Sequence, residues 1–425
     1  MTITALHTLF LKFPVVSTDT RKITKDCIFF ALKGDNFNGN KYATEALEKG
    51  AAYVIIDEEE FNTSANHILV EDVLTTLQQL AKYHRNHCQA KVVGLTGSNG
   101  KTTTKELINV VLSKKYNTIA TSGNLNNHIG VPLTLLSIKE DTEIAIIEMG
   151  ANHQKEIGFL SSISHPDFGY ITNFGKAHLE GFGSVEGVIK GKSELYDYLI
   201  PKNKSVFLNA DDPIQLQKLG SYINKFGFSI NNPKYYKIEF IKADPFVELK
   251  VEDHTIHSQL IGSYNFTNCA AAIVIGKYFN VPLKDIKNAI ESYVPENNRS
   301  QIIKKNGHHI ILDAYNANPT SMKAALENFR DLNAKNKVAV LGDMLELGET
   351  AMQEHRSIVE MTAEFGFDSV YYVGANFTDA TTNENSFDKL ESLSTYLKEN
   401  PLPKNSTILI KGSRGIALER VLELL

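Results

Sequence analysis

The chain has 425 residues, which is too long for a single core, and its 42% hydrophobic and 22% charged content is ordinary for a globular protein. The net charge of -5 at pH 7 disfavours nucleic-acid binding through bulk positive charge. Three widely spaced cysteines, Cys27, Cys88 and Cys269, follow no metal-ligand pattern and indicate a reducing compartment. Without a signal-like start or a long apolar run, we expect a cytoplasmic protein with no membrane insertion.

Short β-branched runs alternate with helix-like segments along the whole chain, which is typical of α/β domains with largely parallel sheets. We predict three domains, at residues 1–89, 90–297 and 298–425. The first domain should contain strands at 27–32 and 53–57, a turn-rich loop at 33–40 and a helix at 73–87.

The second and third domains repeat the alternation of strands and helices. In the second we predict strands at 91–95, 143–148, 169–172 and 205–209, and helices at 101–113, 185–199 and 265–279. In the third we predict strands at 309–313, 337–341, 369–373 and 407–410, and helices at 321–332, 351–365, 392–399 and 415–425.

A glycine-containing segment, Thr96-Gly97-Ser98-Asn99-Gly100-Lys101-Thr102-Thr103, joins the first strand and helix of the second domain. Glycines let a loop turn tightly and approach a ligand, and the helix N-terminus then directs N–H groups at an anion. Lys101 adds positive charge, and the Thr102 hydroxyl can bind Mg²⁺. The pattern predicts a nucleotide-phosphate loop.

This loop departs from the strict GxxxxGK[ST] pattern, because Leu95 stands six residues before Lys101 where a glycine is expected. The alternative is an ordinary turn before a helix. The agreement of an apolar strand, Gly-Lys-Thr and a following helix favours the phosphate site.

Two polar residues follow other predicted strands and should lie at the same edge of the parallel sheet. Glu148 ends the apolar strand at 143–148 and is a candidate Mg²⁺ ligand. His178 lies in a glycine-bounded loop and is a candidate ligand of a second metal ion. The alternatives are an exposed strand end and a structural histidine.

With these residues in place, the sequence resembles the Mur ligase family of peptidoglycan synthesis over nearly its whole length. The resemblance rests on the phosphate loop and on five further motifs in the expected order, at 124–132, 148–152, 178–183, 313–319 and 341–348. It implies a UDP-binding N-terminal domain, a central P-loop ATPase domain with a parallel sheet, and a Rossmann-like C-terminal domain.

The resemblance also implies roles for residues that no spacing rule identifies. Segments 17–21 and 34–42 resemble the uridine-side motifs, and segment 411–414 a substrate-contacting loop. The residues expected to contact the nucleotide are Asn265, Asn268, Arg299, Asp313, Asn316 and Asn318. Lys192 resembles a lysine that CO₂ carbamylates; such an anion could bind one of two Mg²⁺ ions, which an ammonium would repel.

Within the family, the asparagine-rich motifs are most similar to members that join D-alanyl-D-alanine to UDP-N-acetylmuramoyl-tripeptide. The implied reaction uses ATP to form an acyl phosphate, with Lys101, Lys192 and His178 as catalytic residues. The base that accepts the amine proton is left open between His178, Asp343 and Glu346. We expect a monomer that binds these two substrates and no nucleic acid.

Three other functions compete with this one. A related ligase could add a diamino acid to the muramoyl dipeptide or glutamate to folate, but the motifs at 124–132 and 313–319 argue against both. A P-loop kinase or nucleotide switch would not need a third α/β domain. An inactive nucleotide-binding scaffold would not need Lys101, Glu148, His178 and Lys192 together.

Overall fold

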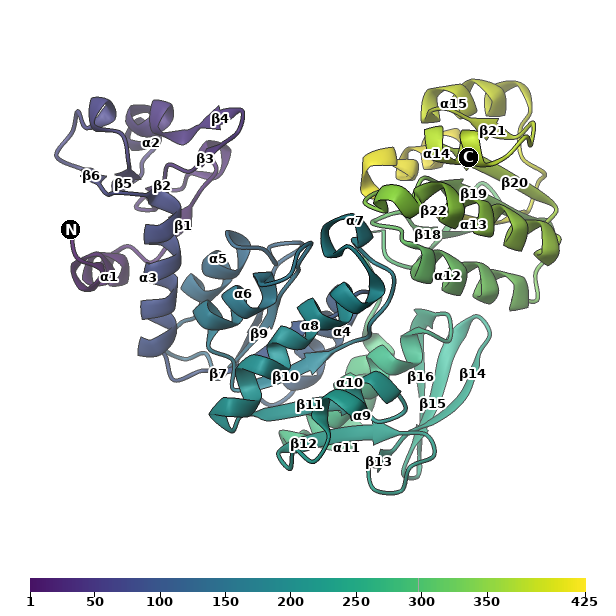
Figure 1. Ribbon diagram of the computed structural model, residues 1–425, viewed down its shortest axis with the longest axis horizontal. Coiled ribbons are helices and arrows are strands. Elements are labelled where there is room, and N and C mark those ends of the chain that lie inside the picture. Colours follow the sequence, from purple (N-terminus) through teal and green to yellow (C-terminus); the bar gives the residue numbers. More distant parts are fainter. Residues whose placement is uncertain (297) are drawn as a thin grey trace.

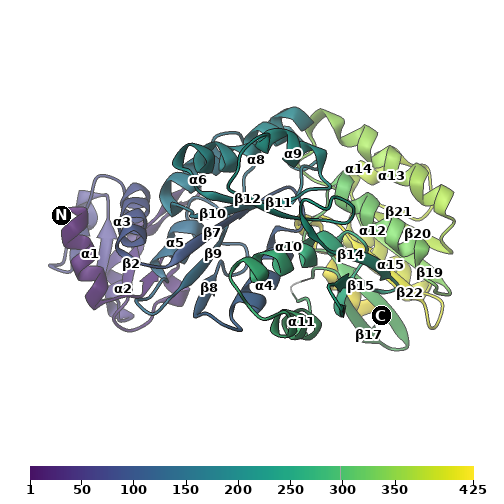
Figure 2. The ribbon, with the colours of Figure 1, turned by 90° about the horizontal axis from the view of Figure 1, so that it is seen from below.

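The N- and C-terminal domains lie on opposite sides of the central domain (Figures 1 and 2). The computed structural model describes residues 1–296 and 298–425. The predicted boundary at 297 lies outside the described residues, and the domain limits stay a prediction. No helix among the described residues combines the length and apolar character needed to cross a bilayer.

The N-terminal domain has a four-stranded parallel sheet in the order β1-β2-β5-β6. These strands are Val16–Ser17, Ile28–Phe30, Tyr53–Ile56 and His67–Leu69, and the helices are α1 (Ile3–Lys12), α2 (Ala43–Glu48) and α3 (Val73–His87). The turn-rich loop predicted at 33–40 is instead a small antiparallel hairpin of β3 (Lys33–Gly34) and β4 (Phe37–Asn38). Gly39 closes this hairpin against the backbone, where a Cβ atom would lie 2.6 Å from the carbonyl oxygen of Leu32.

The central domain has a seven-stranded parallel sheet in the order β13-β12-β11-β10-β7-β9-β8. In chain order, β7 to β13 are Lys91–Thr96, Thr118–Ala120, Ile144–Glu148, Phe168–Ile171, Ser205–Asn209, Lys225–Ser229 and Tyr236–Lys237. The helices α4 to α11 are Lys101–Leu112, Gly130–Leu136, Glu156–Ser164, Leu179–Phe182, Val185–Leu199, Pro213–Leu219, Asn265–Tyr278 and Leu283–Ser292.

Helices cover both faces of this sheet, which explains its continuous apolar strands. In β9, Ile144 and Ile146 belong to the core that includes α4 and α10, whereas Ala145 and Ile147 belong to the core that includes α5, α6 and α8. A three-stranded antiparallel sheet, absent from the prediction, follows: β14 (Glu239–Ala243), β15 (Phe246–Val251) and β16 (His254–Ile261).

The C-terminal domain has a six-stranded sheet in the order β17-β18-β22-β19-β20-β21, parallel except for the edge strand β17. The strands β17 to β22 are Gln301–Lys305, His308–Asp313, Lys337–Gly342, Ser369–Val373, Ser386–Phe387 and Thr407–Lys411. The helices α12 to α15 are Pro319–Asp331, Ala351–Phe365, Ala375–Ala380 and Leu390–Glu399.

The α-helix predicted at 415–425 is wrong. This segment forms two 3₁₀ helices, η6 (Arg414–Ile416) and η7 (Leu418–Leu424), because Ala417 has φ +54° and interrupts regular helix geometry. The other 3₁₀ helices, η1 to η5, are Thr20–Lys22, Gly39–Tyr42, Glu59–Phe61, Ile200–Lys202 and Gly348–Thr350.

Direct contacts join the C-terminal domain to the phosphate loop and the sheet edge beside it. The Nδ2 of Asn318 donates to the Oδ1 of Asn99 over 2.7 Å, and the Lys176 amide donates to the Thr320 hydroxyl over 2.9 Å. The Lys176 ammonium also pairs with Glu354 at 2.6 Å. The structure is therefore closed between these domains.

Candidate active site

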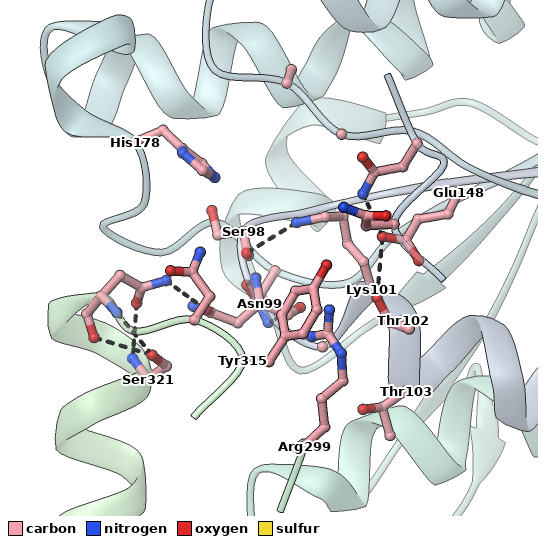
Figure 3. A pocket seen from close by; sticks show the side chains of 18 of the residues that line it. Ser98, Asn99, Lys101, Thr102, Thr103, Glu148, His178, Arg299, Tyr315 and Ser321 are labelled. Carbon is pink, nitrogen blue, oxygen red and sulfur yellow. Dashed lines mark hydrogen bonds between the residues drawn. The ribbon is translucent and has the colours of Figure 1, made fainter. Parts of the chain in front are cut away.

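A cavity of about 640 Å³ lies between the central and C-terminal domains, with the phosphate loop on its wall (Figure 3). Its lining includes most of the predicted site residues: Ser98, Asn99, Gly100, Lys101, Thr102, Thr103, Glu148, His178, Asn265, Asn268, Arg299 and Asp313. Three predicted residues, Thr96, Gly97 and Lys192, do not line it. The structure therefore brings predicted site residues from the central and C-terminal domains together in one cavity.

Two glycines shape the phosphate loop because side chains would not fit. Gly97 has φ +144°, and a Cβ atom there would lie 1.9 Å from the Thr172 hydroxyl. Gly100 has φ +77°, and its Cβ atom would lie 2.6 Å from Oδ1 of Asn268. Thr96 ends β7 buried beneath the loop and donates to the carbonyl of Met149 at 2.8 Å. Thr96 and Gly97 thus support the loop rather than line the cavity.

Lys101 begins α4 and turns its ammonium back over the loop, donating to the carbonyls of Gly97 at 2.8 Å and Ser98 at 3.2 Å. Burial lowers its pKa; nearby Glu148 opposes that shift, and the positive charge of Arg299 adds to it. The Arg299 guanidinium lies 3.7 Å above the ring centre of Tyr315. Figure 3 shows Arg299 and Tyr315 beside the loop, so two cationic groups from two domains face one space.

Glu148 ends β9 and is 1% exposed. Its Oε1 accepts hydrogen bonds from the Asn126 amide at 2.8 Å and the Thr102 hydroxyl at 3.2 Å. Its Oε2 is buried and has no hydrogen-bond partner among the described residues. An unsatisfied carboxylate oxygen beside a hydroxyl is the oxygen set that Mg²⁺ prefers, so these residues fit that ion.

No group of three His, Cys, Asp or Glu side chains in the described ranges could hold a metal ion by itself. This is compatible with Mg²⁺, which usually keeps several waters and shares its coordination with substrate phosphates. The same observation argues against a metal ion held entirely by protein side chains of these types.

Lys192 is fully buried on α8, behind the cavity wall. Its ammonium nitrogen donates to the carbonyl of Ala151, a lining residue, at 3.1 Å and lies 5.0 Å from the ring centre of Phe182. Burial, aided by the positive charge of Lys101, holds the pKa of Lys192 well below its ordinary value. A neutral amine is the form that reacts with CO₂, so this environment fits a lysine that is carbamylated.

His178 lines the cavity with φ +53°, and its Nδ1 pairs with the carboxylate of Glu346 from the C-terminal domain. The structure argues against Asp343, which the sequence left as one candidate for the base. Its side chain is 3% exposed and caps α14, where it accepts hydrogen bonds from the amides of Asn376 at 3.0 Å and Phe377 at 2.9 Å. Asp343 therefore has a structural role, and His178 and Glu346 remain as candidates for the base that accepts the amine proton.

The residues expected near the nucleotide form a connected polar wall. Asn268 accepts from the Thr104 hydroxyl at 3.0 Å and donates to Asn265 at 2.7 Å. Asp313 ends β18 and pairs with the Lys411 ammonium at 2.5 Å. Asn316 and Asn318 also line the cavity.

The partners of some lining residues could not be predicted from the sequence. Asn126 and Tyr315 belong to quoted motifs, but nothing in their spacing indicates contacts with Glu148 and Arg299. Ser300 and Tyr264 are joined by a hydroxyl–hydroxyl hydrogen bond of 2.9 Å that links the central and C-terminal domains. Only the folded chain shows these partners.

Comparisons with known proteins agree with this geometry. The model of the Mur ligase middle domain matches residues 95–276, that of the Mur ligase glutamate ligase domain matches 298–414, and that of the Mur ligase family catalytic domain matches 12–85. The UDP-N-acetylmuramoyl-tripeptide–D-alanyl-D-alanine ligase of Bacillus subtilis (strain 168) is 36% identical over 424 residues, covering 96% of this chain and 92% of the relative. The enzyme of the same name from Escherichia coli (strain K12) is 35% identical, covering 96% and 93%.

Solved structures give the same result. MurF from Acinetobacter baumannii superimposes with a TM-score of 0.84 at 31% identity, covering 96% of this chain and 92% of that one. The MurF ligase of Thermotoga maritima in complex with ADP has a TM-score of 0.84 at 28% identity and covers 97% of both chains. With matching domain models across the chain and full-length relatives above 30% identity, this chain belongs to the Mur ligase family.

Proposed function

We propose that this chain is an ATP-dependent ligase that joins D-alanyl-D-alanine to UDP-N-acetylmuramoyl-tripeptide through an acyl phosphate. The full-length relatives from Bacillus subtilis and Escherichia coli carry that activity in their names. The observation that carries the proposal is that one cavity is lined by Lys101 and Glu148 of the central domain and by Arg299 of the C-terminal domain.

The cavity suits a nucleoside triphosphate next to a carboxylate. The amides of the phosphate loop and the N-terminus of α4 would bind the β- and γ-phosphates, with Asn265 and Asn268 toward the nucleoside. The Thermotoga maritima relative was solved in complex with ADP, which supports binding of an adenine nucleotide by this chain. Segments 17–21 and 34–42 of the N-terminal domain would hold the uridine end, away from this cavity.

Thr102, Glu148, His178 and carbamylated Lys192 are the residues that would hold two Mg²⁺ ions. Bound Mg²⁺ would neutralise phosphate charge and polarise the transferred phosphoryl group. Supporting this assignment are the unpartnered oxygen of Glu148 and the burial of Lys192 without a carboxylate hydrogen-bond partner among the described residues. Intact-protein mass spectrometry under CO₂ tests the carbamate: the protein should gain the mass of one CO₂, and Lys192→Ala should not.

The reaction has two steps. A carboxylate oxygen of the tripeptide attacks the γ-phosphorus and ADP leaves; the dipeptide amine then attacks the acyl carbon, phosphate leaves and the amine loses a proton. Because carboxylate and triphosphate repel each other, the first step needs dense positive charge, which Lys101 and Arg299 supply. The closed contact between domains would keep water from the acyl phosphate.

The domain limits, the oligomeric state and the cellular location are each proposed and can each be tested. The domain limits 1–89, 90–297 and 298–425 should coincide with sites of limited proteolysis. Light scattering should give the mass of a monomer. Fractionation of the source cells should recover the protein in the cytoplasm.

The function is tested by measuring phosphate release with UDP-N-acetylmuramoyl-tripeptide, D-alanyl-D-alanine and ATP, omitting each in turn. Release should require all three. Release with a diamino acid and the muramoyl dipeptide would instead support a related ligase, and release without the dipeptide would support an ATPase or kinase.

A further inference from the structure

A short loop of the C-terminal domain, residues 343–348, is held by hydrogen bonds to residues distant in the sequence. It follows β19, and three consecutive amides have defined acceptors: Asp343 donates to the carbonyl of Val373 at 2.9 Å, Met344 to Nε2 of His355 at 3.0 Å, and Leu345 to the hydroxyl of Ser413 at 2.9 Å. Such anchoring fixes the position of the next residue, Glu346.

Glu346 is presented to the central domain rather than to its own. It adopts φ +62°, an uncommon conformation for a non-glycine residue, and its carbonyl accepts the amide of Glu180 at 3.2 Å. Its side chain is 49% exposed, lines the cavity and lies against Nδ1 of His178. The carboxylate therefore faces the space between the two domains.

The other carboxylates of the cavity have other partners, apart from the Oε2 of Glu148, which is buried and assigned to Mg²⁺. Glu148 binds Thr102 and Asn126, and Glu156 accepts the amides of Asn152 and His153. Asp313, the third, pairs with Lys411 and accepts the amide of Ser300. Within the described residues, the Glu346 carboxylate forms an ion pair with one side chain only, that of His178.

The substrates of the proposed reaction differ in charge. ATP and the tripeptide bring phosphates and carboxylates, for which the lining cations Lys101, Arg299 and Lys411 are suited. The dipeptide brings a primary ammonium that must end beside the acyl carbon. A half-exposed carboxylate on a fixed loop is the complementary group.

We propose that Glu346 binds the ammonium group of the incoming dipeptide and so places the nucleophile. This inference rests on the proposed function and adds a residue that determines the amine substrate. It also gives a reason for the anchored loop, since a carboxylate that positions a nucleophile must itself be fixed.

A competing account is that Glu346 only fastens the two domains together through His178. The chain offers a matched control, because Glu354 also forms an ion pair between the central and C-terminal domains, with Lys176, and does not line the cavity. A fastening residue would affect both chemical steps, whereas an amine-binding residue would affect the second.

The experiment compares Glu346→Gln, Glu346→Asp and Glu354→Gln in two assays. The first follows ligation with D-alanyl-D-alanine. The second replaces the dipeptide with neutral hydroxylamine, which attacks the acyl carbon, releases phosphate and gives a hydroxamate. The ratio of the two rates isolates recognition of the ammonium from formation of the acyl phosphate.

We expect Glu346→Gln to raise the KM for the dipeptide and lower the ratio of ligation to hydroxamate formation by about 10- to 100-fold. Glu346→Asp should give an intermediate ratio, and Glu354→Gln should leave the ratio at the wild-type value. An unaltered ratio in Glu346→Gln would overturn the proposal, even if both rates fell. A wild-type protein that makes no hydroxamate would instead contradict the proposed function.

Discussion

The phosphate loop and the loop at 343–348 lie on the same cavity but are built in different ways. Both follow a parallel strand, β7 and β19, at the carboxyl edge of a sheet. The first gets its shape from Gly97 and Gly100 and acts through its own backbone and Lys101. The second gets its shape from distant residues, among them His355 and Ser413. Distant residues also hold the phosphate loop, since the amides of Ser98 and Asn99 donate to Asn173 at 3.1 and 3.0 Å. The difference lies in the residues that act: the turns and the charge of the phosphate loop are encoded locally, by glycines and a lysine, whereas the place of Glu346 depends on the folded domain.

The largest effect should come from removing the charge of the locally encoded loop. Lys101→Ala removes the positive side chain of the phosphate loop, and turnover should fall at least about 100-fold with the fold retained. ADP release with both substrates measures this, and circular dichroism checks the fold. Lys91→Ala, which removes an exposed lysine at the start of β7, is the control and should keep full turnover. Normal turnover in Lys101→Ala would show that the site is misassigned.

The loop at 343–348 should be disrupted by a substitution at a residue outside it. Gly374 has φ +125°, and a Cβ atom there would lie 2.2 Å from the carboxyl carbon of buried Asp343. Gly374→Ala should therefore cost about 2–4 kcal/mol of unfolding free energy, through strain and loss of the α14 cap. Gly366→Ala, at φ +63° with no neighbour within 4 Å, should cost about 1 kcal/mol. Urea denaturation compares the two; equal losses would mean that Asp343 is not held tightly.

Acid should loosen the second loop more than the first. Burial lowers the pKa of His355, whose Nδ1 donates to Ala351 at 2.7 Å while Nε2 accepts the Met344 amide, with Asp343 3.6 Å away. Below about pH 6.5 the unfolded chain therefore binds more protons at His355 than the folded chain does. The contribution of neutral His355 to the unfolding free energy is complete above the unfolded pKa of about 6.5 and is lost as the pH falls below it.

The His355→Gln variant isolates this contribution. Between about pH 7.5 and pH 5.5, the urea midpoint of the wild type should fall more than that of His355→Gln. Other buried histidines are common to both proteins and cancel in the comparison. Parallel pH profiles would mean that His355 does not anchor the loop through its neutral form.

The smallest effect should come from the ion pair that joins the two domains at the surface. Lys176 is 48% exposed and pairs at 2.6 Å with Glu354, which is 13% exposed, so water reaches the pair from the lysine side. Since water screens the charge of a half-exposed lysine, Glu354→Gln should change the unfolding free energy by about 1 kcal/mol or less. A loss well above that value in urea denaturation would show that this pair, rather than cavity contacts, holds the domains closed.

Sequence reasoning reached the locally encoded features best. The apolar run and Gly-Lys-Thr located the phosphate loop, and the helix at 73–87 matches α3. It missed β14 to β16, although Val247, Leu249 and Val251 alternate with Glu248 and Lys250 in β15, which is the period-two signal of a half-buried strand. It also expected an α-helix at 415–425, where Ala417 has φ +54° and two 3₁₀ helices form. It also could not choose between Asp343 and Glu346, since only the folded chain shows that Asp343 is a buried cap.

The acyl phosphate is the central claim, and isotope transfer tests it most directly. The tripeptide is prepared with oxygen-18 in its terminal carboxylate and incubated with ATP, D-alanyl-D-alanine and the protein. If the carboxylate attacks ATP, each phosphate released should carry one labelled oxygen, and the other should remain in the new peptide bond. Unlabelled phosphate, released together with the joined product, would contradict the mechanism.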